Sequence, residues 1–258
     1  MPEKQGLGGN GLEKYDPETG RYISQDETAG SDDLDDLDFE LDDITDESYM
    51  DLEVDEEEPV EEPKSGLDAI FNKKEKETTF EEDCAGANPA YKYESSSNGP
   101  YHINCQRCIA AYDLRRRGYD VEALPRIEKW DEFAKNNGWV KLWKGGSLDD
   151  LIPTGAKNWV NMANKTKKAI IEMGDGARCV IKVSWSKYSG HVLIAENQGG
   201  KIQFLDPQDG TIYKDDSWCF GTQCTKTKIF RIDNKEIDES KIQKACKNVK
   251  GEKKNGWF

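Results

Sequence analysis

The chain is poor in histidine and in long apolar segments. It carries two histidines in 258 residues, His102 and His191, so any Cys–His chemistry and any histidine-ligated metal must use one of them. No run of about 18 apolar residues occurs, and a membrane-spanning helix needs one. Residues 1–4 begin no hydrophobic segment of the kind found in secretory signals. We therefore expect neither a classical signal peptide nor a transmembrane segment.

Basic side chains are almost missing from the first quarter of the chain. Residues 1–64 hold 24 of the 51 acidic and 4 of the 36 basic residues, a net charge of −20. Residues 65–258 hold the remaining 27 acidic and 32 basic residues, a net charge of +5. So acidic a segment cannot bury enough apolar surface to offset the entropy of ordering. We expect 1–64 to be a disordered tail, either a solvated tether or, over 32–63, a docking segment for a basic partner. This acidity also argues against a specific nucleic-acid partner.

All seven cysteines lie in the basic part of the chain. Because their number is odd and no secretory signal accompanies them, we expect free thiols rather than a disulfide framework. Two other arrangements remain open. Cys105-x-x-Cys108 and Cys219-x-x-x-x-Cys224 could together bind zinc, although the two pairs lie farther apart than is usual. The first pair could instead be a redox motif, although no thioredoxin-like pattern surrounds it.

The rest of the sequence is long enough for one domain with a core. We expect 65–84 to be a linker with one short helix and 85–258 to be the folded, catalytic domain. Apolar spacing and Gly stops predict helices at 105–117, 126–135, 156–173 and 239–248, and strands at 119–123, 177–184, 191–196, 201–205, 216–220 and 228–232. Helices segregated from an antiparallel sheet indicate an α+β fold.

Cys105, His191 and Asp206 form a candidate catalytic set. Cys105 opens a predicted helix after Asn104 in the N-cap position, where unpaired N–H groups and the helix dipole favour the nucleophilic thiolate. His191 begins one predicted strand and Asp206 ends the next, and residues 197–200 supply a hairpin turn between them. Both side chains should therefore lie at one end of the hairpin, where a carboxylate can orient an imidazole. The set supplies a nucleophile, a base and an orienting acid.

Two blocks of sequence resemble the papain-fold toxin domains, of glutamine deamidase type, of bacterial polymorphic toxin systems. The first is Asn-Cys-Gln-Arg-Cys at 104–108, continued by Ala-Tyr-Asp-Leu-Arg-Arg-Arg-Gly-Tyr-Asp-Val-Glu-Ala at 111–123. The second is Gly-His-Val at 190–192, followed by Phe-Leu-Asp-Pro-Gln at 204–208. Both blocks occur in the family's order, and the resemblance extends over about half of the chain, from 88 to 209.

The resemblance implies a papain-like fold, with the nucleophile helix packed on an antiparallel sheet. Cys105 would be the nucleophile, His191 the general base and acid, and Asp206 its orienting partner. Gln208, which follows the acid in the motif, would help to position the substrate. In papain-like proteases the second of two such cysteines is the reactive one, so Cys108 stays an alternative nucleophile.

The family's donor for the oxyanion is not obvious in this sequence. Papain-like proteases carry a glutamine several residues before the nucleophile, and none lies between Pro89 and Cys105. The backbone N–H of Cys105 and the side chain of Asn104 or Asn98 are the candidate substitutes.

The resemblance also implies an activity and its surroundings. We expect a toxin- or effector-type hydrolase that deamidates glutamine side chains of a target protein without a cofactor, in the cytoplasm or after delivery to a target cell. A cognate immunity protein or inhibitor is a further expected partner, and a membrane is not. A cysteine protease, a transglutaminase-like enzyme and a non-catalytic papain-like scaffold of a phage-related or mobile-element protein are the alternatives, because the triad alone does not separate them.

Overall fold

The computed structural model describes residues 14–16, 21–23, 66–127, 131–187 and 189–249. The chain divides into two units, Met1–Glu58 and Pro59–Phe258, which are described separately. In the first unit, β1 (Lys14–Asp16) and β2 (Arg21–Ile23) form an antiparallel pair. The rest of the acidic tail predicted for 1–64 lies outside the described residues.

The second unit is built on one antiparallel sheet of six strands in the order β4-β9-β5-β6-β7-β8. The strands are β4 (Ile152–Pro153), β5 (Arg178–Ser184), β6 (Gly190–Gln198), β7 (Lys201–Asp206), β8 (Thr211–Tyr213) and β9 (Lys228–Arg231). Gly199 and Gly200 join β6 to β7 with φ values of +60° and +84°, a left-handed conformation that glycine adopts without strain. The predicted hairpin is therefore confirmed.

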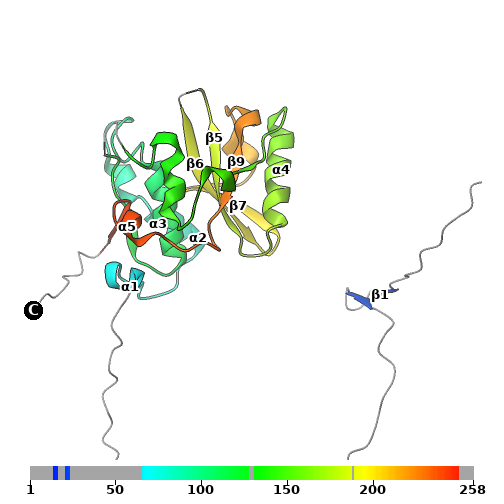
Figure 1. Cartoon of the computed structure of the whole chain (residues 1–258), viewed down its shortest axis with the longest axis horizontal. Helices are drawn as coiled ribbons and strands as arrows, with labels where there is room; N and C mark the ends of the chain where they lie inside the picture. Colours follow the sequence, from blue (N-terminus) through cyan, green and yellow to red (C-terminus); the bar gives the residue numbers. More distant parts are fainter. Residues whose placement is uncertain (1–13, 17–20, 24–65, 128–130, 188, 250–258) are drawn as a thin grey trace, which may run out of the picture. The chain divides into compact units, whose positions relative to one another are not determined.

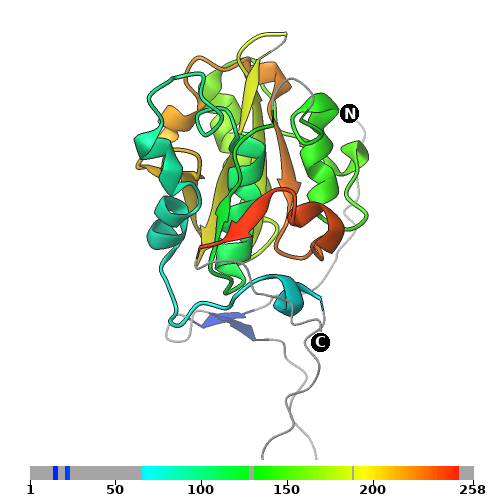
Figure 2. The ribbon, with the colours of Figure 1, turned by 90° about the vertical axis from the view of Figure 1, so that its left-hand side faces the viewer.

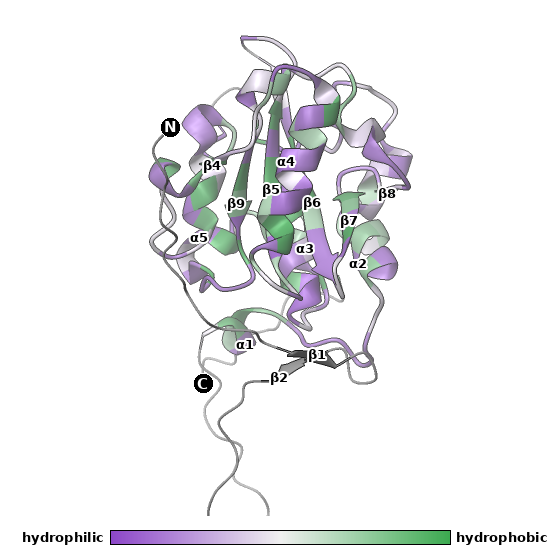
Figure 3. Cartoon of the chain, turned by 90° about the vertical axis from the view of Figure 1, so that its right-hand side faces the viewer, coloured by the Kyte–Doolittle hydropathy of each residue, from purple (hydrophilic) through white to green (hydrophobic). Residues whose placement is uncertain are grey.

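Helices cover both faces of this sheet. In Figure 1 the strands stand between α3 (Cys105–Arg116) and α4 (Trp159–Ile171). Successive residues of β5 alternate between the two cores, because Val180 packs with the α3 core and Ile181 with the α4 core. Colouring by hydropathy shows β5 and β9 as apolar strands between these layers (Figure 3).

The α3 face carries most of the remaining structure, which is turned toward the viewer in Figure 2. A second, two-stranded sheet pairs β3 (Val121–Ala123) with β10 (Cys246–Asn248). The other elements are the helices α1 (Leu67–Ile70), α2 (Phe80–Gly86) and α5 (Glu239–Ile242), and the 3-10 helices η1 (Pro89–Tyr93), η2 (Lys135–Leu142), η3 (Leu148–Asp150), η4 (Asp216–Cys219) and η5 (Cys224–Lys226).

This architecture confirms the predicted α+β class, but three predicted elements are wrong. No α-helix forms in the described part of 126–135, because the Asp131 carboxylate accepts the Phe133 N–H and forms a local turn instead. The strand predicted at 216–220 is the 3-10 helix η4, which begins where the Asp215 side chain accepts the Ser217 N–H.

The helix predicted at 239–248 is also wrong in its second half. Helix α5 ends at Ile242, and the chain then pairs as β10 with β3. Local sequence does not reveal this change, since β3 lies more than a hundred residues earlier and offers the pairing edge only in the folded unit.

A buried ionic network joins α3 to the sheet. The Asp113 carboxylate, which is fully buried, accepts hydrogen bonds from Trp143 Nε1 (2.9 Å) and Arg117 Nε (3.0 Å) and from the Arg178 guanidinium of β5. Arg178 also donates to Glu196 of β6 at 3.2 Å. Each buried charge thus has partners, which is the condition for tolerating it in the interior.

Glu196 is the second acidic centre of the network. It accepts hydrogen bonds from the Tyr112 hydroxyl (2.8 Å) and from Arg116 Nη2 (2.9 Å), both on α3. Burial by itself would raise the pKa of Glu196, but Arg116 and Arg178 outweigh this and hold the pKa below its ordinary value. Glu196 therefore stays ionised and ties β6 to α3.

We predict that Asp113→Ala lowers the free energy of unfolding by about 3–5 kcal/mol, because it removes the buried carboxylate that Arg178, Arg117 and Trp143 share. Urea denaturation of the full chain measures this loss. Glu172→Ala is the control: its carboxylate is 64% exposed beside Lys168, and its removal should cost less than about 1 kcal/mol. Equal losses in the two variants would contradict a structural role for the network.

Candidate active site

Cys105 lies at the N-terminus of α3 and on the wall of a cavity of about 590 Å³. Its side chain is nearly buried, with 5% of its surface exposed. As the first residue of the helix, Cys105 has a backbone N–H without an acceptor inside the helix. The positive end of the helix dipole at this point stabilises a negative charge on sulfur and on any oxyanion that forms beside it.

The structure brings His191 and Asp206 together, as the hairpin pattern predicts. His191 is the second residue of β6 and Asp206 the last of β7, so the antiparallel pairing places them at the same end. His191 Nε2 lies 2.6 Å from Asp206 Oδ2, and both side chains are nearly buried. The bond occupies Nε2, which leaves Nδ1 as the ring nitrogen that can serve Cys105.

His191 carries a strongly perturbed pKa. Burial lowers the pKa of the imidazole, but the negative charges of a Cys105 thiolate and of Asp206, with the hydrogen bonds to both residues, raise it well above 6.5. The charged imidazolium is thus favoured beside a thiolate and the Asp206 carboxylate.

Gln208 holds the end of this hairpin against the segment before α3. Its backbone N–H donates to Asp206 Oδ1 at 3.0 Å, and its side-chain Nε2 donates to the His102 carbonyl at 2.8 Å. The buried Asn88 side chain donates to the Gln208 carbonyl at 2.8 Å. These bonds favour a positioning function for Gln208, which also lines the cavity.

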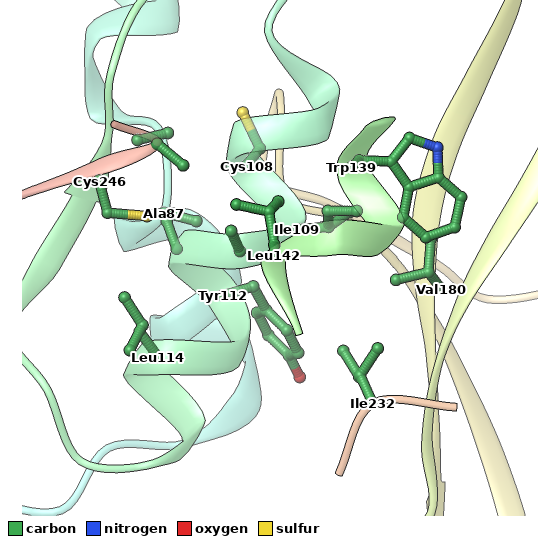
Figure 4. Packing of buried hydrophobic residues seen from close by; sticks show 14 of the residues in the cluster. Ala87, Cys108, Ile109, Tyr112, Leu114, Trp139, Leu142, Val180, Ile232 and Cys246 are labelled. Atoms are coloured by element: carbon green, nitrogen blue, oxygen red, sulfur yellow. The ribbon is translucent and has the colours of Figure 1, made fainter. Parts of the chain in front are cut away.

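Cys108 is placed differently from Cys105. Its side chain is fully buried among the apolar residues shown in Figure 4, and its thiol donates to Asn104 Oδ1 at 3.1 Å. Burial raises the pKa of the Cys108 thiol well above its ordinary value. The arrangement favours Cys105 as the nucleophile, since a buried thiol held in the neutral form is unreactive.

The amide side chains expected to stabilise an oxyanion do not face the cavity. Asn104 is fully buried and makes no N-cap bond, and its Nδ2 donates to the Leu124 carbonyl at 3.1 Å. Asn98 is exposed and does not line the cavity. Of the candidate donors, the backbone N–H of Cys105 remains. The geometry supports a positioning function for Asn104 at the start of the helix.

Trp185 is a site residue that sequence reasoning missed. Its indole stacks on the His191 ring, with 5.6 Å between centroids and 11° between planes, and 49% of its surface is exposed. The backbone N–H of Trp185 donates to the Ser189 carbonyl at 2.9 Å, which fixes the turn between β5 and β6. The sequence feature that could have pointed to Trp185 is its place in the turn just before the strand that carries His191. The indole covers one face of the imidazole.

The structure does not assemble the predicted zinc alternative. Cys105 and Cys108 belong to the core on the α3 face, whereas Cys219 and Cys224 pack with the α4 core. Within the described ranges no group of three or more His, Cys, Asp or Glu residues could hold a metal ion. All seven cysteines are free thiols.

In the described part of the chain no helix combines the length and the apolar character that crossing a bilayer requires.

We predict that iodoacetamide modifies Cys105 faster than any other thiol, including the more exposed Cys224. The raised pKa of His191 favours an imidazolium next to the sulfur, and an adjacent imidazolium stabilises the reactive thiolate. In His191→Ala the rate at Cys105 should therefore fall. Peptide mapping by mass spectrometry gives the rates. Faster modification of Cys108 would contradict the prediction and identify Cys108 as the nucleophile.

We predict that Trp185→Ala slows the modification of Cys105 by about threefold to tenfold, the value of one aromatic stacking contact. Trp185→Phe should keep most of the rate. Trp159→Ala is the matched control, because Trp159 is 45% exposed and pairs with Phe220 rather than with a site residue. Identical rates in the two alanine variants would show that the stacking does not orient His191.

The comparisons with known proteins give a family match for part of the chain. Neither the curated proteins nor the solved structures contain a match to the chain. A family model described as papain fold toxin 1, glutamine deamidase, matches residues 103–211. The matched segment includes Cys105, His191 and Asp206, and it confirms the resemblance and the papain-like fold inferred from the sequence. Residues 103–211, less than half of the chain, are thus similar to the papain-fold toxins of glutamine deamidase type.

Proposed function

We propose that the protein is a thiol hydrolase that converts glutamine side chains of a target protein to glutamate, with Cys105, His191 and Asp206 as its catalytic residues. The observation that supports this most directly is the coupling of His191 to both Cys105 and Asp206 at the cavity. The family match supports glutamine as the substrate side chain and a protein as its carrier.

In the first half of the proposed reaction, the Cys105 thiolate attacks the carboxamide carbon of glutamine. The negative charge moves to the amide oxygen, which the backbone N–H of Cys105 and the helix dipole stabilise. The His191 imidazolium then gives its proton to the departing nitrogen. The C–N bond breaks, ammonia leaves, and a thioester to Cys105 remains.

In the second half, neutral His191 takes a proton from a water molecule that attacks the thioester. The C–S bond breaks, glutamate is released, and the thiolate–imidazolium pair is restored. The net reaction is glutamine plus water to glutamate plus ammonia. Asp206 keeps Nε2 occupied throughout, so that Nδ1 faces the sulfur, and it stabilises the imidazolium.

We predict that the full chain releases ammonia from glutamine-containing peptides or proteins and that one glutamine is found as glutamate by peptide mass mapping. Cys105→Ala and His191→Ala should lower kcat by about a thousandfold or more, as for residues that act as one unit. Asp206→Asn should lower kcat by about a hundredfold to ten thousandfold, because the imidazole loses its orienting charge.

Cys108→Ala is the matched control, one helical turn from the nucleophile, and it should retain activity within a few-fold. Cleavage of the peptide chain would identify a protease instead, and transfer of an added amine to glutamine would identify a transglutaminase-like enzyme. An inert Cys105 with no turnover would favour the non-catalytic scaffold.

A further inference from the structure

The cavity beside Cys105 has an uneven charge. Three of its lining residues are cationic, Arg126, Lys182 and Lys187, and no aspartate or glutamate is among the described residues that line it. Two of these cations come from separate segments of the chain. Arg126 follows the segment that contacts Asn104 ahead of the nucleophile, and Lys182 lies on β5 beside the histidine strand.

Lys182 has neighbours of its own sign. In the β5–β9 pairing it lies directly opposite Lys228, and in the β5–β6 pairing it lies opposite Val192, next to His191. Like charges that face each other across a strand pair destabilise a sheet. Burial lowers the pKa of Lys182, and the charges of Lys228 and Lys226 lower it further. Within the described ranges no carboxylate forms an ion pair with Lys182.

Arg126 is also incompletely partnered. Its backbone N–H donates to the Pro100 carbonyl at 2.9 Å, but its side-chain Nε is buried without a hydrogen-bond acceptor in the described structure. A buried donor without a partner carries a desolvation cost. An anionic oxygen entering the cavity would remove this cost at Arg126 and the repulsion at Lys182.

We propose that the cavity binds carboxylate side chains next to the reacting amide, so that the preferred substrate is a glutamine flanked by aspartate or glutamate. This inference rests on the proposed function. When the substrate is a glutamine of a protein, the anions that enter the cavity with it are the acidic side chains next to that glutamine. Arg126 and Lys182 are the specificity-determining residues. Their partner is the substrate rather than another part of the fold, which explains why the chain keeps a repulsive Lys182–Lys228 pair.

The first test needs no turnover. Iodoacetate and iodoacetamide react with the same sulfur but differ in charge, so the ratio of their rates at Cys105 of the full chain measures the preference for an anion. In Arg126→Gln and Lys182→Gln this ratio should fall by about twofold to fivefold each, the effect of one partly exposed ion pair. It should also fall with added salt.

Lys165→Gln is the matched control, because Lys165 is an exposed cation on α4 and does not line the cavity. Its ratio should equal that of the parent protein. A ratio that stays unchanged in both Arg126→Gln and Lys182→Gln overturns the proposal. Lys182→Gln should be at least as stable as the parent protein in thermal unfolding, because it removes the repulsion from Lys228, so a lower ratio would not reflect unfolding.

The second test uses three peptides with one glutamine flanked by aspartates, by asparagines or by lysines. The aspartate peptide should show the highest kcat/KM for ammonia release. Lys182→Gln should lower the ratio of kcat/KM for the aspartate peptide to kcat/KM for the asparagine peptide. Equal turnover of all three peptides overturns the substrate preference while keeping the deamidase. If no peptide turns over but the iodoacetate ratio falls in the variants, the anion-binding cavity stands and the deamidase proposal fails. A single-stranded oligonucleotide that protects Cys105 better than the aspartate peptide also overturns the proposal.

Discussion

The attachment of α3 to the sheet is the constraint on which the site depends. Asp113 of the helix bonds to Trp143 and to Arg178 of β5. Glu196 of β6 bonds to Tyr112 and Arg116 of the helix. Each charge of this network thus has a partner inside the protein. Buried charges tolerate little displacement, because a charge that loses its partner is left buried with neither a counter-charge nor water. The helix is therefore held in one position, and its first residue, Cys105, is held with it at the cavity.

The histidine side of the site is fixed by the β6–β7 hairpin and its continuation. The Gly199–Gly200 turn sets the register, which places His191 and Asp206 at the same end. Gln208 then bonds to Asp206 and to the His102 carbonyl, so the hairpin end is tied to the segment that precedes the nucleophile. Two separate anchors thus bring the sulfur and the imidazole together, one through α3 and the other through the loop after β7.

Elements of strong local pattern were predictable, and elements that depend on distant partners were not. The α3 helix, the hairpin and the approach of His191 to Asp206 follow from apolar spacing and a glycine turn. The 3-10 helix η4 and strand β10 were mispredicted, the first because of one side-chain turn and the second because of pairing with β3. Tertiary context overrides propensity at such places.

The sequence by itself determined which residues could carry the chemistry, because two histidines and one cysteine at a predicted helix start leave few combinations. The preference for Cys105 over Cys108 rests on the tertiary structure, since both lie in the same turn of the helix and Cys105 is the one that lines the cavity. The tertiary structure also brought Trp185 onto His191 and placed Lys182 and Arg126 on the walls of one cavity. Burial and the pairing of distant strands are properties of the folded chain, and no local pattern encodes them.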